Sequence, residues 1–263
     1  MIVAMSAHHE ATIQRLKQAY ENDPDCLALI IGGSVAKGWA KENSDVDFMA
    51  IVTDERFELS RDTLTIYRTD LTDYEGGYVD GKLVPLRLVH MVAEKGSEPA
   101  RSAYLGARVL FDRTGEVESL IKRILVYPEE GVEERIRRFH SQLMIWAWFV
   151  GEAAKRDDRY LMSRATTEIA LFAMRIVLAV NRRIYPYHKW VTRMVEETPD
   201  KPDGIVEKVH AMLRAQTFES AKAVVDALQA WRDIPIDYRE HCNHFLEDSE
   251  WNWLEGPAPI GDR

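Results

Sequence analysis

The sequence changes character close to residue 127. Before that point, short runs rich in β-branched residues alternate with turns rich in glycine and aspartate, which is typical of a small sheet domain. After it, apolar residues recur every three or four positions over long stretches, which is typical of amphipathic helices. We therefore predict an α+β protein, with a small mixed-sheet domain over residues 1–126 and an all-α helical bundle domain over residues 127–263.

Patterns within each half predict the individual elements. Strands are expected where short apolar or alternating runs end in turn residues, over residues 26–31, 45–53, 64–68, 82–91 and 109–111. Helical periodicity is clearest over residues 6–21, 136–150, 169–179, 206–213 and 221–231. Asp80-Gly81 has the composition of a hairpin turn that leads into the strand at 82–91, and Ser97 and Pro99 open a short helix.

The composition is that of a globular protein with an acidic surface. Hydrophobic residues make up 46% and charged residues 29% of the chain, and the formal net charge is −9 at pH 7. A long nucleic acid held along its backbone calls for a basic surface, so a processive polymerase is disfavoured. The two cysteines lack metal-type spacing. No apolar run suits a signal peptide or a membrane helix, which predicts a cytoplasmic protein without membrane contact.

The segment from residue 32 to residue 48 carries the strongest chemical signal. A Gly-Gly-Ser triplet ends one apolar strand, and a Ser-Asp-Val-Asp-Phe run opens the next. Asp45 and Asp47 are one residue apart on a strand, so their side chains point from the same face. Paired carboxylates can hold the divalent cations that clamp the attacking and leaving oxygens of nucleotidyl transfer. The glycines allow close approach of a triphosphate, and the Ser34 hydroxyl and nearby amides can donate to its oxygens.

These residues resemble the signature of the polymerase-beta-type nucleotidyltransferase superfamily, in which Gly-Gly or Gly-Ser precedes Asp-x-Asp on a strand. With its helical second half, the chain is most similar to antibiotic-modifying members such as kanamycin and lincosamide nucleotidyltransferases. The resemblance implies transfer of a nucleoside monophosphate, usually AMP from ATP, to a hydroxyl of a small-molecule acceptor, with release of pyrophosphate. It also implies that Gly33 and Ser34 hold triphosphate oxygens, and that Asp45 and Asp47 are catalytic ligands of a two-metal Mg²⁺ site.

The superfamily normally adds a third carboxylate from a neighbouring strand. Residues 83–91, where it is expected, contain no acid, and Pro85 occupies a plausible position for it. Asp80 is our candidate for the third metal ligand, although an Asp-Gly pair is equally an ordinary turn. The absence of a third carboxylate would favour a different function, that of a non-catalytic module that binds a nucleotide as a sensor.

In the antibiotic-modifying relatives, a glutamate of the helical domain takes the proton of the acceptor. Glu152 is the first candidate for this catalytic base and Glu168 the second. Each has aromatic or apolar neighbours one helical turn away, which can raise a carboxyl pKa towards the range of a base. Arg156, four residues after Glu152, fits an exposed ion pair equally well.

Other cations and aromatic residues are candidates for nucleotide contacts. Lys37 and Ser44 lie in or beside the signature loop, and Lys189 lies in the segment 185–190, whose aromatic rings could stack on a base or sugar. The alternative is that this segment is a hydrophobic plug between two helices. The acidic charge balance suits a cationic acceptor, and equally a surface that only keeps the protein soluble.

A different enzyme class shares some of these features. Small nucleotidyltransferase domains also pair with helical HEPN domains, whose ribonuclease signature is an arginine followed five residues later by a histidine. The pairs Arg135–His140 and Arg183–His188 both have this spacing. Because this spacing occurs twice in one helical half, it has low specificity as a signature. Ribonuclease action is therefore kept only as the alternative function.

Overall fold

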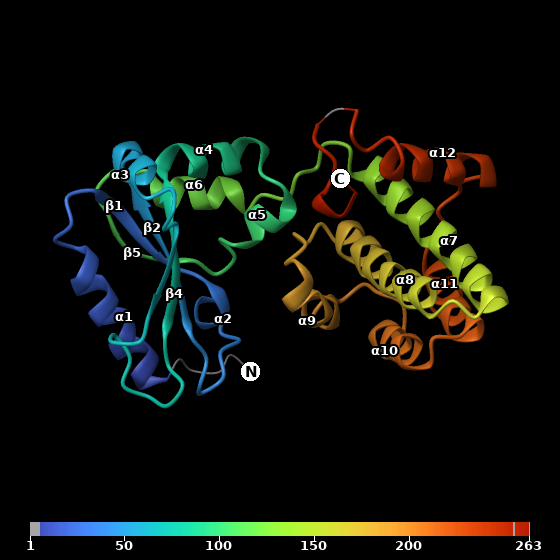
Figure 1. The fold of residues 1–263 in the computed structure, drawn as a ribbon, viewed down its shortest axis with the longest axis horizontal. Helices are drawn as coiled ribbons and strands as arrows, with labels where there is room; N and C mark the ends of the chain where they lie inside the picture. Colours follow the sequence, from blue (N-terminus) through green and yellow to red (C-terminus); the bar gives the residue numbers. More distant parts are fainter. Residues whose placement is uncertain (1–5, 255, 263) are drawn as a thin grey trace. The chain divides into compact units, whose positions relative to one another are not determined.

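The computed structural model describes residues 6–254 and 256–262, and its contacts divide the chain into two compact units (Figure 1). The sheet unit comprises Met1–Tyr127, and the helical unit comprises Pro128–Arg263. The predicted fold class, α+β with a mixed sheet and a helical part, is confirmed.

A five-stranded sheet forms the centre of the sheet unit, with strand order β3-β4-β2-β1-β5. Its strands are β1 (Cys26–Ile31), β2 (Val46–Val52), β3 (Thr65–Arg68), β4 (Val79–Pro85) and β5 (Arg108–Asp112). The pairing of β2 with β4 is parallel, and the other three pairings are antiparallel. The sheet is therefore mixed, and its parallel pair brings residues 46–52 beside residues 79–85.

The expected turn at Asp80-Gly81 and the strand at 82–91 are wrong. Residues 79–85 form β4, and the apolar run that follows is the helix α4 (Leu86–Lys95), which Pro85 precedes as its N-cap residue. A short apolar run fits a strand and a buried helix equally well, which is the reason for the error. Gly81 lies within β4 opposite Phe48 of β2. Glycine fits there because a Cβ would lie 2.2 Å from the Phe48 ring.

Two apolar layers cover the sheet because side chains of β2 alternate between its faces. Phe48 and Ala50 pack with α1 (Ala7–Tyr20), whereas Met49 and Ile51 pack with the helices of the other face. The remaining helices of this unit are α2 (Gly33–Ala36), α3 (Asp54–Leu59), α5 (Glu98–Ser102) and α6 (Val117–Ile124). The site-bearing ends of β1 and β2 are thus held by a sheet that is buried on both sides.

The helical unit is built around two long helices, α7 (Val132–Arg156) and α8 (Arg159–Val180). A two-residue connection joins them, in which Asp157 adopts a left-handed conformation and the Asp158 side chain accepts a hydrogen bond from the Leu161 amide. The remaining elements are η1 (His188–Trp190), α9 (Val191–Glu196), α10 (Ile205–Ala215), α11 (Phe218–Trp231), α12 (Tyr238–Ser249) and η2 (Ile260–Asp262).

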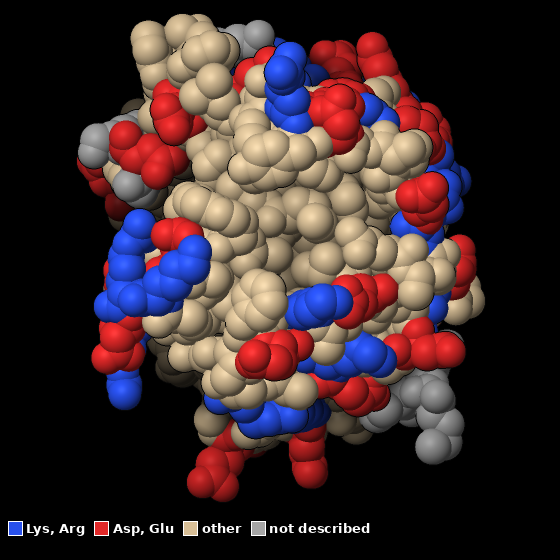
Figure 2. Space-filling model, turned by 90° about the vertical axis from the view of Figure 1, so that its right-hand side faces the viewer, with Lys and Arg blue, Asp and Glu red and all other residues tan. Residues whose placement is uncertain are grey.

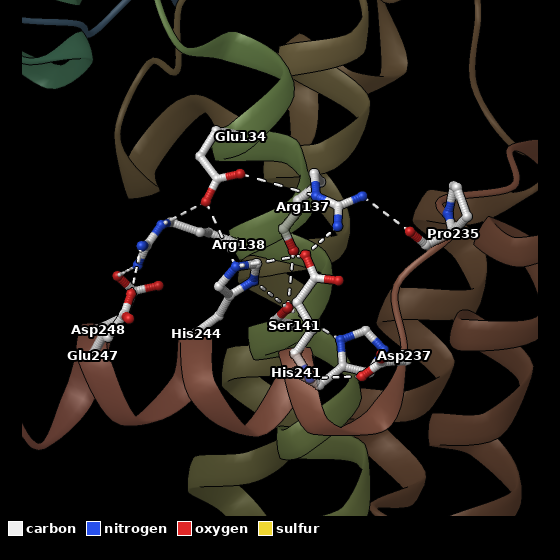
Figure 3. A network of polar contacts seen from close by, with 11 residues as sticks. Glu134, Arg137, Arg138, Ser141, Pro235, Asp237, His241, His244, Glu247 and Asp248 are labelled. Carbon is white, nitrogen blue, oxygen red and sulfur yellow. Dashed lines mark hydrogen bonds and ion pairs between the residues drawn. The ribbon is translucent and has the colours of Figure 1, made fainter.

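Polar contacts hold α12 against α7 (Figure 3). The buried Ser141 hydroxyl lies 3.1 Å from Nδ1 of His241 and 3.0 Å from Nδ1 of His244. Nearer the end of α12, the Arg138 guanidinium lies 2.6 Å from Glu247 and 2.7 Å from Asp248. The attachment of α12 therefore depends on hydrogen bonds and ion pairs as well as on apolar packing.

An apolar hollow lies between α7, α11 and α12, and Figure 2 shows this face with charged side chains around an uncharged centre. Its volume is about 430 Å³, and Trp148, Phe218 and Val225 contribute to its lining. Despite the length of α7 and α8, none of the described helices is apolar enough over a sufficient length to span a membrane.

Candidate metal centre

Three carboxylates lie close together at the N-terminal ends of β2 and β4, two neighbouring interior strands of the sheet. Asp45, Asp47 and Asp80 each offer one oxygen, and these oxygens lie within 4.8 Å of one another. Asp47 and Asp80 are direct partners in the parallel register of β2 and β4, so their side chains leave the same face side by side. Asp45 directly precedes β2. Asp80, which we expected in a turn, thus belongs to a strand.

The loop that follows β1 is fitted closely to Asp47. The Gly32 amide donates a 2.9 Å hydrogen bond to the Asp47 carbonyl, which ties the end of β1 to the start of β2. Gly33 has a φ of +63°, and a Cβ at this position would lie 1.6 Å from Oδ2 of Asp47. Position 33 therefore requires glycine for two reasons. The backbone there is left-handed, and the Asp47 carboxylate occupies the space that a side chain would need.

Ser34 and Lys37 lie in the tight turns after Gly33. Ser34 is buried in α2, and its carbonyl accepts a 2.9 Å hydrogen bond from the Trp39 amide. The Lys37 ammonium lies 6.0 Å from the centroid of the Trp39 ring. A backbone hydrogen bond from Trp39 to Ser34 thus closes the loop, and Ser34 directly follows the glycine that contacts Asp47.

Negative charge dominates the surroundings of the three carboxylates. The charge of Asp45 and a hydrogen bond to it raise the pKa of Tyr78, and the charge of Asp80 adds to the effect. Burial raises the pKa of Tyr74, and the charge of Asp45 raises it further. Both tyrosines therefore stay protonated at neutral pH and can donate hydrogen bonds beside the site.

The donor set fits a hard divalent cation. It consists of carboxylate oxygens, which are the ligands that Mg²⁺ prefers, and Mg²⁺ commonly takes only a few protein ligands beside water and phosphate. Three carboxylates so close together also repel one another unless a cation offsets their charge. Asp45 and Asp47 are half-buried and Asp80 is exposed, so the site is open to an ion and a substrate.

A family model described as "Domain of unknown function (DUF4037)" matches residues 100–191, which is less than half of the chain. No curated protein matches. Among solved structures, the chain is similar to a nucleotidyltransferase-like protein from Exiguobacterium sibiricum 255-15, with a TM-score of 0.47 and 12% identity over 94% of this chain and 89% of that one. A similarity at this level carries no information on activity, which has to come from the side chains.

Glu152, the first candidate for the base, lies on α7 in an ion-paired environment. Its carboxylate accepts a 2.8 Å hydrogen bond from Lys155 and lies 3.0 Å from Arg156. The hydrogen bond from Lys155 lowers the pKa of Glu152, and the charges of both cations act in the same direction. The raised pKa expected from its apolar neighbours is therefore absent, and the ion pair with Arg156 is present.

Glu168, the second candidate, lies on α8 and lines a cavity of about 790 Å³ within the helical unit. Aromatic side chains such as Trp146 and Phe172 share this lining. Burial raises the pKa of Glu168 despite Arg164, whose guanidinium lies 2.7 Å away. The side chains of Glu152 and Glu168 are similarly covered, at 14% and 12% exposure. Burial is nevertheless the largest influence on the pKa of Glu168, whereas the Lys155 hydrogen bond is the largest influence on the pKa of Glu152.

The aromatic segment 185–190 lies in the helical unit and has two parts. Tyr185 is buried, and the Arg175 guanidinium lies 4.3 Å from the centroid of its ring. The Tyr185 hydroxyl lies 3.1 Å from Nδ1 of His188. Lys189 is exposed on η1, with its ammonium 5.6 Å from the Trp190 ring. Tyr185 is thus buried, as a hydrophobic plug between helices would be. The nucleotide contact of Lys189 stays a prediction.

The two arginine–histidine pairs make structural contacts in the helical unit. The Arg135 guanidinium donates to the carbonyls of Pro128 and Glu130. His140 is buried, which lowers its pKa to about 4. In the second pair, Arg183 donates a 2.9 Å hydrogen bond to the Glu197 carbonyl. Three of these four residues thus have structural surroundings of their own, and the ribonuclease alternative stays a prediction.

Three residues near Asp45 were missed by sequence reasoning. His8 and His9 lie in the first turn of α1 and donate to the loop before Asp45. Tyr74, in the segment 69–78, donates to the same loop. Ser44, predicted as a nucleotide contact, is at the centre of these hydrogen bonds. No spacing rule connects a histidine pair to a serine 35 positions further on, so no sequence signal could have found the link.

Proposed function

We propose that the chain is a metal-dependent nucleotidyltransferase that moves AMP from ATP onto a hydroxyl of a small-molecule acceptor and releases pyrophosphate. The observation that carries this proposal is the group of three carboxylates, Asp45, Asp47 and Asp80, against a glycine loop that continues into a serine. Carboxylates on adjacent strands beside a glycine-rich loop are the protein parts that nucleotidyl transfer requires.

The three aspartates would hold Mg²⁺ through oxygen atoms, with Asp45 and Asp47 as the ligands of a two-metal site and Asp80 as the third carboxylate. When bound, Mg²⁺ would neutralise charge on the phosphates and lower the cost of placing an oxygen nucleophile beside them. Gly33 leaves room for the Asp47 carboxylate, and its backbone and the Ser34 hydroxyl would donate to triphosphate oxygens.

In this reaction the acceptor oxygen forms a bond to the α-phosphorus of ATP, and the bond from that phosphorus to the pyrophosphate oxygen breaks. The proton of the acceptor hydroxyl then needs a base. We propose a glutamate of the helical unit for this role, and the surroundings of Glu168 support it better than those of Glu152. Proton removal is easier for a carboxylate whose pKa lies closer to neutrality.

The acceptor class is supported by charge and by the helical unit. A net charge of −9 is unfavourable for a long nucleic acid and suits a small or cationic molecule. The cavity that contains Glu168 combines aromatic side chains with a carboxylate, as small-molecule sites do. The antibiotic-modifying subtype rests on the resemblance of residues 32–48 and on the helical second half, and ATP and Mg²⁺ would be supplied by the cytoplasm.

The test is a Mg²⁺-dependent screen of α-labelled ATP against pools of antibiotics, metabolites, short RNAs and proteins, with pyrophosphate release as the readout. Asp47→Asn should lower transfer at least a thousandfold without unfolding the protein, because it removes an anionic ligand. Asp62→Asn, at an exposed carboxylate of the same unit, is the matched control and should be fully active. Binding of ATP without pyrophosphate release in any pool would favour the sensor instead.

A further inference from the structure

Asp45 differs from the other two carboxylates in how it is held. Asp47 and Asp80 belong to β2 and β4, and the ladder between these strands fixes both. Asp45 lies one residue before β2, at the end of an irregular loop. A ligand on such a loop keeps its place only if the neighbouring peptide groups are fixed by other means.

Every polar group of Ser44, the residue before Asp45, has a hydrogen bond. Its amide donates to the Lys41 carbonyl at 3.1 Å, and its hydroxyl accepts from the Lys41 amide at 2.8 Å. Its carbonyl accepts from Nε2 of His9 at 3.0 Å and from the Tyr74 hydroxyl at 2.7 Å. On the other side, the Val46 amide donates to the Tyr78 carbonyl at 3.2 Å. The peptide groups on both sides of Asp45 are therefore fixed.

His9 on α1 and Tyr74 in the segment 69–78 both donate to the Ser44 carbonyl from outside the loop that contains Ser44. We call these two hydrogen bonds the Ser44 clamp. Because a carbonyl oxygen only accepts, Nε2 of His9 must carry the proton. The ring of His9 is buried and packs edge-on against Tyr74, with 5.4 Å between centroids. Nε2 of His8 lies 2.7 Å from the Glu42 carbonyl, which extends the contact along the loop.

The helix and loop that carry the clamp are themselves anchored. Glu10 on α1 forms a two-pronged ion pair with Arg108 on β5, at 2.7 and 2.8 Å. Arg15 on α1 donates to the Leu71 carbonyl at 3.0 Å and to the Asp73 carboxylate, which lies next to Tyr74. The clamp therefore connects the loop before Asp45 to a helix that is ion-paired with β5, and to a second loop that is bonded to that helix.

We propose that His9 and Tyr74 are positioning residues that set the affinity of the metal centre by holding Asp45 in place through the Ser44 carbonyl. This inference rests on the proposed function, since it requires that Asp45, Asp47 and Asp80 bind a divalent cation. It adds to that function a control of ligand geometry by α1, an element that contributes no carboxylate to the site.

The test measures Mn²⁺ binding to the full chain by calorimetry, together with pyrophosphate release. Tyr74→Phe removes one hydroxyl, and His9→Leu removes the ring donor and keeps apolar bulk. Each should weaken Mn²⁺ binding about tenfold, the lower end of the effect of losing a partner that orients a metal ligand. His9→Gln, whose amide can reach the same carbonyl, should recover most of the affinity. Pyrophosphate release at limiting Mg²⁺ should fall with the affinity and recover at saturating Mg²⁺.

The matched control is Thr12→Val, a buried position one turn further along α1 that should leave Mn²⁺ affinity unchanged. Thermal melts verify that each variant is folded, and if His9→Leu fails to fold, Tyr74→Phe decides alone. Wild-type affinity in Tyr74→Phe and in folded His9→Leu would overturn the clamp and leave the proposed function standing. A wild-type protein that binds neither Mn²⁺ nor Mg²⁺ would overturn both.

Discussion

Replacing Gly33 with alanine tests the geometry of the site directly. The backbone at this position has a φ of +63°, and a residue with a Cβ pays about 1–2 kcal/mol in that conformation. The new Cβ would also lie 1.6 Å from Oδ2 and 2.3 Å from Cγ of Asp47, whereas carbon contacts ordinarily begin at about 3.5 Å. The carboxylate of Asp47 must therefore move by well over an ångström.

A displacement of that size removes Asp47 from any Mg²⁺ that it binds, because Mg²⁺ requires near-octahedral ligands at about 2.0–2.1 Å. We expect Gly33→Ala to lower kcat/KM for pyrophosphate release about a thousandfold, equivalent to about 4 kcal/mol of transition-state stabilisation. Mn²⁺ affinity, measured by calorimetry, should fall in parallel. The melting temperature should fall by several degrees because of the backbone strain.

Gly115→Ala separates the backbone strain from the clash. Gly115 has a φ of +76°, so alanine there has a similar conformational cost, but its Cβ would have no atom within 4 Å. This variant should lose similar stability and keep both Mn²⁺ affinity and activity. Wild-type metal affinity and turnover in Gly33→Ala would contradict the predicted clash with Asp47. An equal loss of both in Gly115→Ala would assign the effect to backbone strain instead.

Three further predictions follow from the site and the helical unit. Asp80→Ala should reduce the rate of pyrophosphate release far more than the affinity for ATP, because the other carboxylates and the glycine loop remain. An equal loss of ATP affinity, measured by titration, and of turnover would contradict this. Glu168→Gln should lower kcat by ~10²–10⁴ and flatten the acidic limb of the pH–rate profile, whereas Glu152→Gln should change little; the reverse ranking would restore Glu152. Since burial lowers the pKa of His140 to about 4 from 6.5, the unfolded chain binds one more proton between these values. Stability should therefore fall as the pH drops from 6.5 to 4, by up to about 1.4 kcal/mol per unit from this group, and His140→Leu should reduce that slope in urea titrations at pH 7, 6 and 5.

The part of the site that could be predicted is the part that is local in sequence. The strand at 26–31, the glycine loop and the paired acids at 45 and 47 lie within one stretch, where periodicity and residue type are sufficient. Asp80 was selected by residue type, but for a wrong geometric reason. Its place depends on the parallel pairing of β2 with β4, and that register is a long-range property. Pro85 added to the error, because it precedes a helix in what reads as one apolar run.

The surroundings of individual side chains were less accessible to sequence reasoning. Glu152 and Glu168 both have apolar neighbours one turn away, yet burial raises the pKa of one and a lysine contact lowers that of the other. Which neighbours cover a helical glutamate is decided by the helices packed around it. The hydrogen bond from His9 to the Ser44 carbonyl likewise joins residues that only the folded sheet unit brings together.

The contact between Gly33 and Asp47 has a consequence for evolution within a family of such chains. Because a side chain at position 33 and the carboxylate at position 47 compete for the same space, the two positions are constrained to change together. A relative that acquires a larger residue at 33 is expected to shorten or lose the acid at 47, and with it the capacity to bind the cation. This residue pair would therefore separate descendants that keep the chemistry from those that retain only the fold, before any of them is assayed.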